Sequence, residues 1–235
     1  DPHLFISNVI DEIKGRERWV DHDTLLRMYP LNPISAMLIA SISKKSFSQN
    51  QRTLFSFLNS FESLGYQRYL QEMVSIENAN YSPDLLWDYL SLNFENQIIN
   101  SPDGQSWLIA RDCLSRLEAT QHSSLEIRCL KTLSALQIFG DSVLLKTNIE
   151  TIQASIVFEN VKLLNEAMEG LAKKKIVFYK EVTQTFHLSE ATDFDLEEEI
   201  KPFQIKTLPD SSVLQTLLKL RPIVGKRHYI ETGNL

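Results

Sequence analysis

The chain has few of the residues that interrupt helices and few that form cross-links. It contains 7 glycines and 8 prolines in 235 residues, which favours long helices joined by short connections over a many-stranded sandwich. Its two cysteines, Cys113 and Cys129, provide neither a disulfide framework nor a CxxC metal motif. Both lie in apolar helical patterns, so we expect two buried core thiols.

Motifs for catalysis and metal binding are also missing. The 5 histidines show no HxxxH or HxH spacing, so no metal site is expected. No serine, cysteine or carboxylate lies in a recognisable nucleophile or acid–base motif, so no catalytic residue is assigned, although such groups can still meet in space. The pair Gly225–Lys226 lacks the upstream glycine and the following Ser/Thr of a phosphate loop. We therefore do not expect the chain alone to hydrolyse ATP, and a hydrolytic enzyme is the least favoured class.

No apolar run reaches the roughly 18 residues that span a bilayer, and no signal peptide is visible. We expect a cytoplasmic protein without a membrane contact. The formal charge of -6 argues against a uniformly basic nucleic-acid surface but leaves local basic patches open. Because the chain starts without methionine and stops without an obvious finished element, we expect a piece of a longer polypeptide.

Helical spacing and capping signals predict a mainly α-helical protein with a helical bundle over residues 1–120. Pro33 should occupy the first turn of ISAMLIASISKK, and Gly65 should break the next helical stretch. Ser82 and Pro83 should open SPDLLWDYLSLNFENQII, and SPDGQSW should form a loop. The expected apolar face of that helix is Leu85, Leu86, Tyr89, Leu90 and Leu92, and the expected core aromatics are Trp19, Trp87, Trp107, Phe55, Phe57 and Phe61.

Residues 121–200 have a different pattern, which predicts a winged-helix domain. Ser123 or Ser124 should cap a helix that Gly140 closes, and a short helix at NIETIQASI and a third around 161–175 should follow. The β-rich runs IVFY and TFHL, separated by KEVTQ, predict a hairpin. Three helices followed by a hairpin form the winged-helix (helix-turn-helix plus β-hairpin) arrangement, in which the third helix packs over the first. Residues 201–235 would be a C-terminal extension, truncated at its end.

A cluster of polar residues in SFSQNQRTLFSFLNS precedes apolar residues at helical spacing. Its members are Gln49, Asn50, Gln51 and Arg52. Such side chains favour water unless each finds a hydrogen-bond partner, so we interpret the cluster as an interdomain or nucleotide-facing edge. The Arg52 guanidinium has the planar donors that match phosphate oxygens. The alternative is a surface arginine paired with a carboxylate, beside amides that cap a helix.

The candidates for nucleic-acid contact are basic and amide side chains near the predicted wing and at the end of the chain. They are Lys162, Asn165, Lys173, Lys174, Lys175, Lys180, Arg221, Lys226 and Arg227. The glutamates among them, Glu159, Glu166, Glu169 and Glu181, repel phosphate. We therefore favour a wing that contacts protein, with DNA binding left open. For the basic end we favour a solvated terminus over a contact with nucleic acid or nucleotide.

Three stretches together resemble a known protein region: YPLNPISAMLIASISKKSFSQNQRTLFSFL, the predicted winged helix ending in DFDLEEEI, and RPIVGKRHYIETGNL. They are similar to the part that follows the nucleotide-binding core in large bacterial P-loop ATPases of the AAA+/STAND kind, several from phage-defence systems. The resemblance implies a lid-like bundle packed on an ATPase core and a winged helix for protein or DNA contacts. The missing phosphate loop is a departure.

Two functions follow as expectations. The first is a non-catalytic regulatory and interaction segment of a larger ATP-binding protein, whose partner is the P-loop domain of the parent chain or another protein. ATP and Mg would then be cofactors of the parent core only. The second is a DNA-binding winged-helix transcription regulator with a helical sensing or dimerisation domain.

Overall fold

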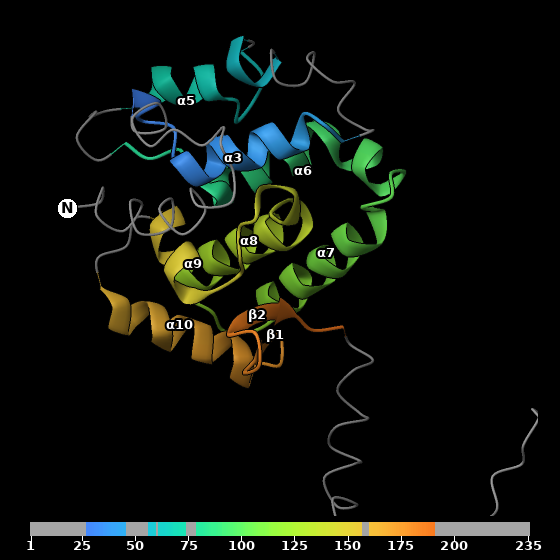
Figure 1. The fold of residues 1–235 in the computed structure, drawn as a ribbon, viewed down its shortest axis with the longest axis vertical. Coiled ribbons are helices and arrows are strands. Elements are labelled where there is room, and N and C mark those ends of the chain that lie inside the picture. Colours follow the sequence, from blue (N-terminus) through green and yellow to red (C-terminus); the bar gives the residue numbers. More distant parts are fainter. Residues whose placement is uncertain (1–26, 46–55, 60, 74–78, 157–159, 191–235) are drawn as a thin grey trace, which may run out of the picture. The chain divides into compact units, whose positions relative to one another are not determined.

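The computed structural model describes residues 27–45, 56–59, 61–73, 79–156 and 160–190, all within one compact unit that ends at Ala191. This part is mainly α-helical and carries a small antiparallel hairpin (Figure 1). Within these ranges, no helix has the length and apolar character needed to cross a bilayer. The predicted core residues Trp19 and Phe55, and the acidic and basic segments after residue 191, lie outside the described residues.

The elements follow one another with short connections. The helices are α3 (Pro33–Ile42), α5 (Tyr66–Glu72), α6 (Pro83–Ile99), α7 (Gly104–Glu118), α8 (Ser124–Phe139), α9 (Ile149–Ile156) and α10 (Val161–Lys173), with a 3-10 turn η2 (Asp141–Val143) before α9. The hairpin consists of β1 (Val177–Lys180) and β2 (Thr185–Leu188). Residues 56–59 are also helical.

The helix ends largely follow the predicted signals. Pro33 opens α3, Gly65 precedes α5, and Gly140 follows the last residue of α8. Ser123 forms a capping box, in which its hydroxyl accepts from the Glu126 amide and its own amide donates to the Glu126 carboxylate at 2.7 Å. These local signals therefore place most of the boundaries correctly.

Two local predictions differ from the structure. Helix α7 begins at Gly104, within the predicted loop SPDGQSW, because the amide of Trp107 already bonds the carbonyl of Asp103 in the first turn. Ser82 stands at the N-cap of α6, but its hydroxyl donates to the Asp84 carboxylate rather than accepting from a backbone amide. Composition alone does not distinguish a loop from a first helical turn built of the same polar residues.

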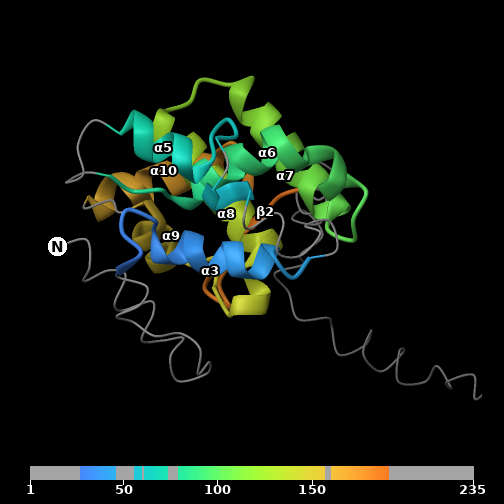
Figure 2. The ribbon, with the colours of Figure 1, turned by 90° about the horizontal axis from the view of Figure 1, so that it is seen from above.

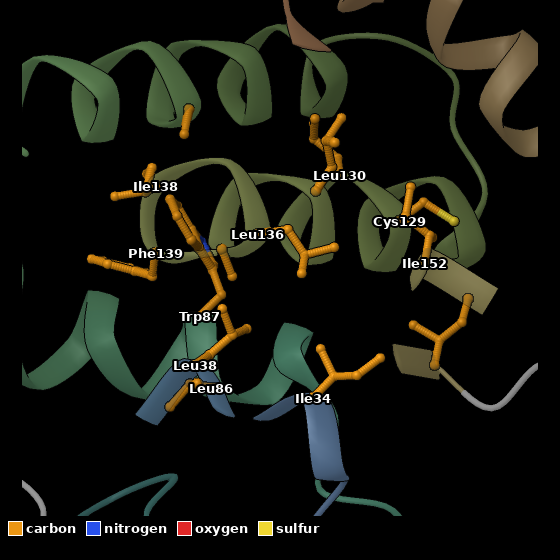
Figure 3. Close-up of a cluster of buried hydrophobic side chains, with 14 of the residues drawn as sticks. Ile34, Leu38, Leu86, Trp87, Cys129, Leu130, Leu136, Ile138, Phe139 and Ile152 are labelled. Atoms are coloured by element: carbon orange, nitrogen blue, oxygen red, sulfur yellow. The ribbon is translucent and has the colours of Figure 1, made fainter. Parts of the chain in front are cut away.

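Helix α8 lies at the centre of the core, and α3, α6, α7, α9 and α10 all contact it. Figure 3 shows side chains of α8 meeting those of α3 and α6, including Leu38 and Trp87. The Trp87 ring stacks on Trp107 at 4.0 Å between centroids, and both are buried. Cys113 and Cys129 are buried and free, which confirms the expected core thiols.

The prediction of core positions is wrong at two places. Phe61 is 65% exposed and Leu92 is 60% exposed. Phe61 follows the helical residues 56–59 and precedes a turn, so helical spacing no longer applies to it. The apolar face of α6 is narrower than expected: Leu86, Tyr89 and Leu90 are buried, whereas Leu92 points away from the core.

The segment before α3 is tied to the end of α9. The Asn32 side chain accepts from the Ile34 amide at 2.9 Å and donates to the carbonyls of Ala154 and Ser155 at 3.1 and 2.9 Å. The last carbonyls of a helix have no partner inside the helix, so one buried amide side chain satisfies two helix ends. Helix α3 accordingly lies beside α9 (Figure 2).

The predicted domain boundary at residue 120 falls between α7 and α8. Helices from both sides contribute to one cluster of buried apolar residues, and α8 contacts α6 and α7 as well as α9 and α10. The boundaries at 120 and 200 remain predictions about organisation, and the helices on either side of 120 share a core.

Candidate interaction face of helix α10 and the hairpin

The hairpin has a buried root and an exposed tip. Its register pairs Val177 with Leu188 and Tyr179 with Phe186. Val177 and Leu188 are buried, whereas Tyr179 is 46% exposed and Val182 in the turn is 90% exposed. Because side chains alternate across a strand, Tyr179 and Phe186 continue the face that packs on the helices at the root.

Three separate elements hold the hairpin. Arg116 of α7 donates to the carbonyls of Lys175 and Ser189, on either side of the hairpin. On α8, the side-chain carbonyl of Gln137 accepts from the Leu188 amide at 2.9 Å. In the linker before α9, the carbonyl of Thr147 accepts from the Phe186 amide at 2.8 Å. These bonds fix the hairpin against the helices.

Helix α10 is amphipathic and packs on α8, α9 and β1. Its buried stripe is Leu164, Ala167, Met168 and Leu171, and the Asn160 side chain caps it by accepting from the Leu163 amide at 3.2 Å. Lys162, Asn165, Glu166, Glu169 and Lys173 are exposed. Cationic and anionic side chains thus share the solvent side of this helix.

Lys174, a candidate for nucleic-acid contact, forms an ion pair with Glu126 at 2.6 Å. The side chains are 24% and 10% exposed, respectively. Burial pushes the pKa of Glu126 upward, but the hydrogen bonds from Lys174 and from the Ser123 amide outweigh it, and the net pKa lies below its usual value. A Cβ atom on Gly170 would lie 2.6 Å from the Glu126 carboxylate, so glycine makes room for this pair. Lys174 is therefore engaged within the fold.

The structure separates the remaining candidates. Lys162, Asn165, Lys173 and Lys180 are exposed on α10 and β1. Lys173 is 3.9 Å from Glu169, and Lys175 is partly buried at the turn into β1. The polar cluster Gln49–Arg52 and the terminal residues Arg221, Lys226 and Arg227 lie outside the described residues, so their roles stay predictions.

Between α10, the start of α9 and the hairpin lies an open groove of ≈ 840 Å³. We call it the α10–hairpin groove. Its apolar lining consists of Ile149, Met168, Ala172 and Phe186. Its polar and aromatic lining includes Lys146, Glu150, Asn165, Glu169, Tyr179 and Gln184.

Sequence reasoning missed the groove as a site. In the sequence, Glu169 was noted only because its carboxylate repels the phosphates of DNA, and Glu150 and Tyr179 were not identified as candidates. The available signal was Tyr179 beside Phe178 in a short strand, because a four-residue strand cannot bury aromatic side chains on both faces.

The opposite face of the hairpin carries Phe178 stacked on His187, with 5.5 Å between ring centroids. The His187 ring nitrogen Nε2 lies 2.9 Å from the Thr185 hydroxyl. Partial burial and the nearby Lys180 lower the pKa of His187, so the ring is neutral at pH 7. This face therefore offers a phosphate less positive charge than its residue types suggest.

Among the described residues, no group of three or more His, Cys, Asp and Glu side chains is placed to hold a metal ion. A comparison of the chain with protein-family models, curated proteins and solved structures finds no match.

Proposed function

We propose that the chain is a non-catalytic regulatory and interaction segment of a larger ATP-binding protein, and that α8, α9, α10 and the hairpin act as a winged helix that contacts protein. The observation that carries the protein contact is the α10–hairpin groove, which presents the carboxylates of Glu150 and Glu169 beside an apolar floor. Carboxylates repel the phosphates of a duplex, whereas apolar floors with polar rims are typical of protein interfaces.

The winged-helix part of the proposal is supported by element order and by contacts. Three helices precede the hairpin, and the third, α10, packs on the first, α8. The bond from the Phe186 amide to Thr147 brings the linker between α8 and α9 alongside β2. Together these features hold α10 and the hairpin side by side at one end of the fold (Figure 1).

The ATP-binding part of the proposal rests on the resemblance of the sequence to segments that follow P-loop cores. In this interpretation the cluster Gln49–Arg52 contacts the nucleotide domain. The cluster follows α3, and α3 packs on α6, α8 and α9, so a displacement of α3 would act on the helices that carry the hairpin. The proposal predicts that Arg52→Ala lowers the nucleotide hydrolysis of a full-length ATPase carrying this segment. Unchanged hydrolysis would refute the role of Arg52.

A DNA-binding regulator is the second candidate, because Lys162, Asn165, Lys173 and Lys180 are exposed on α10 and β1. Fluorescence polarisation of a labelled random duplex, at low and at physiological salt, separates the two functions. Our proposal predicts no binding that depends on these lysines. Salt-sensitive binding that Lys162→Glu and Lys173→Glu abolish would instead establish the DNA-binding function.

A further inference from the structure

The α10–hairpin groove combines an apolar floor with an acidic rim. Met168 of α10, which is 2% exposed, and the partly buried Phe186 of β2 belong to the same lining. The floor can accept one or two apolar side chains, because burying them removes apolar surface from water on both partners. An open groove of this kind suits a segment of another chain better than a fully enclosed small molecule.

The charges on the rim are unequal. Glu150 is exposed in the first turn of α9. Glu169 has Lys173 as a neighbour at 3.9 Å, and both side chains are mostly exposed, so this pair neutralises the carboxylate only weakly. The charged residues of the lining are Lys146, Glu150 and Glu169, so one cation and two carboxylates give the lining a net negative charge.

Tyr179 adds a recognition element of a different kind. Its ring packs on Phe186 with 4.9 Å between centroids, yet 46% of the residue stays exposed beside the groove. A tyrosine face attracts a guanidinium or ammonium group through its ring quadrupole. An aromatic face and two carboxylates bordering one apolar floor complement a cationic segment with an apolar anchor.

We propose that the α10–hairpin groove binds a segment of a partner protein in which apolar residues are flanked by arginine or lysine. The apolar side chain rests on the partly buried Ile149, Ala172 and Phe186, and the cations meet Glu150 and Glu169. This inference rests on the proposed function and adds the chemistry of the partner. The same charges act against DNA, whose phosphates the carboxylates repel.

The test is a pair of peptides of opposite charge, acetyl-Arg-Leu-Leu-Arg-amide and acetyl-Glu-Leu-Leu-Glu-amide, titrated into the 235-residue chain. Backbone NMR shifts of residues in α10 and the hairpin report binding, and their concentration dependence gives Kd. We expect the arginine peptide to shift the amide signals of Glu169 and Tyr179. The glutamate peptide should bind with a Kd at least about tenfold higher.

Reversing the charge of the groove tests whether its carboxylates determine which peptide binds. The double variant Glu150→Lys/Glu169→Lys should exchange the preference of the groove, binding the glutamate peptide and losing the arginine peptide. The matched control Glu72→Lys/Glu118→Lys changes the net charge equally at exposed positions of α5 and α7 and should keep the original preference. A gain of glutamate-peptide binding cannot result from misfolding.

Several outcomes would overturn the inference. Equal binding of both peptides, no shifts in α10 or the hairpin at about 1 mM peptide, or an equal loss in the control would each refute charge-directed recognition. Self-association in sedimentation experiments that the Glu150→Lys/Glu169→Lys variant removes would identify a second copy as the occupant. If peptides fail and the duplex also fails to bind, only this inference is lost, whereas lysine-dependent duplex binding refutes the proposed function itself.

Discussion

Replacing Lys174 with methionine removes the ammonium group that pairs with Glu126 and keeps most of the apolar length of the side chain. The Glu126 side chain is 10% exposed in the native pair, and in the variant it retains its bond from the Ser123 amide at 2.7 Å. A buried charge that loses its partner is costly, because the remaining hydrogen bonds do not replace its hydration. We therefore expect Lys174→Met to destabilise the fold, not only to alter its surface.

The size of the expected loss in the free energy of unfolding depends on how deeply the Lys174–Glu126 pair is buried. Exposed ion pairs contribute up to about 1 kcal/mol, whereas breaking a fully buried pair costs about 3–5 kcal/mol. The Lys174 side chain is 24% exposed, so water can partly rehydrate Glu126 in the variant. A loss of about 2 kcal/mol in the free energy of unfolding at pH 7 follows from these two limits.

The loss should depend on pH in a defined direction. The pKa of Glu126 is lowered in the folded protein, so its contribution to stability is present above the unfolded pKa, near 4.3, and is lost as the pH falls through the lower folded pKa. In the variant, burial without Lys174 favours the protonated carboxyl group. The difference in stability between the two proteins should accordingly be largest at pH 7 and narrow below about pH 4.

Urea unfolding followed by tryptophan fluorescence measures this difference, because Trp87 and Trp107 are buried and stacked in the core. Lys173→Met is the matched control, since that side chain is 80% exposed and should change stability by no more than about 0.5 kcal/mol. Equal effects of the two variants, or a Lys174→Met effect that grows on acidification, would refute the reasoning.

The other predictions concern Gly170, Asn32 and Cys129, each with its own readout. A glycine-to-alanine change in an exposed helix stabilises it by up to about 1 kcal/mol. Gly170→Ala should instead destabilise the protein, because the added Cβ displaces the Glu126 carboxylate, and a higher urea midpoint would contradict this. Asn32→Ala should cost about 2–3 kcal/mol through a lost cap, the lost bond to the Ala154 carbonyl, and a Ser155 carbonyl that keeps only the 3.4 Å bond from the Asn80 side chain, whereas the exposed Asn165→Ala should be near neutral in the same assay. Burial raises the pKa of Cys129 to about 12, so Ellman's reagent at pH 8 should modify Cys129 only as fast as the native protein opens, and modification at the rate of a free thiol would show that the site is accessible.

Most of the secondary structure could be predicted from local signals in the sequence. Pro33, the Ser123 capping box and Gly140 act within one or two turns, so their effect is visible in a short window. The hairpin was likewise predictable from β-rich runs around a polar turn, and its strands agree with IVFY and TFHL within one residue.

The tertiary roles of single side chains could not be predicted in the same way. No residue near Asn32 in the sequence indicates that its side chain bonds carbonyls of α9. Lys174 cannot be distinguished from Lys173 and Lys175 in the sequence, because its partner Glu126 comes close only when α10 packs on α8. Phe61 and Leu92 continue an apolar pattern into positions where the side chains are mostly exposed. The groove depends on three segments that meet only in the fold, so its acidic rim has no signature in any one stretch.

The link between Asn32 and α9 also has a consequence during synthesis. The acceptors Ala154 and Ser155 follow Asn32 by 122 and 123 residues, and chains grow at about 5–20 residues per second. For about 6–25 s the nascent chain therefore contains α3 without the carbonyls that the Asn32 side chain will bond, and α8, which ends at Phe139, is made only late in that interval. Until α6, α8 and α9 have all been made, α3 lacks part of the surface that buries it, and capture of this apolar helix by a chaperone competes with its burial.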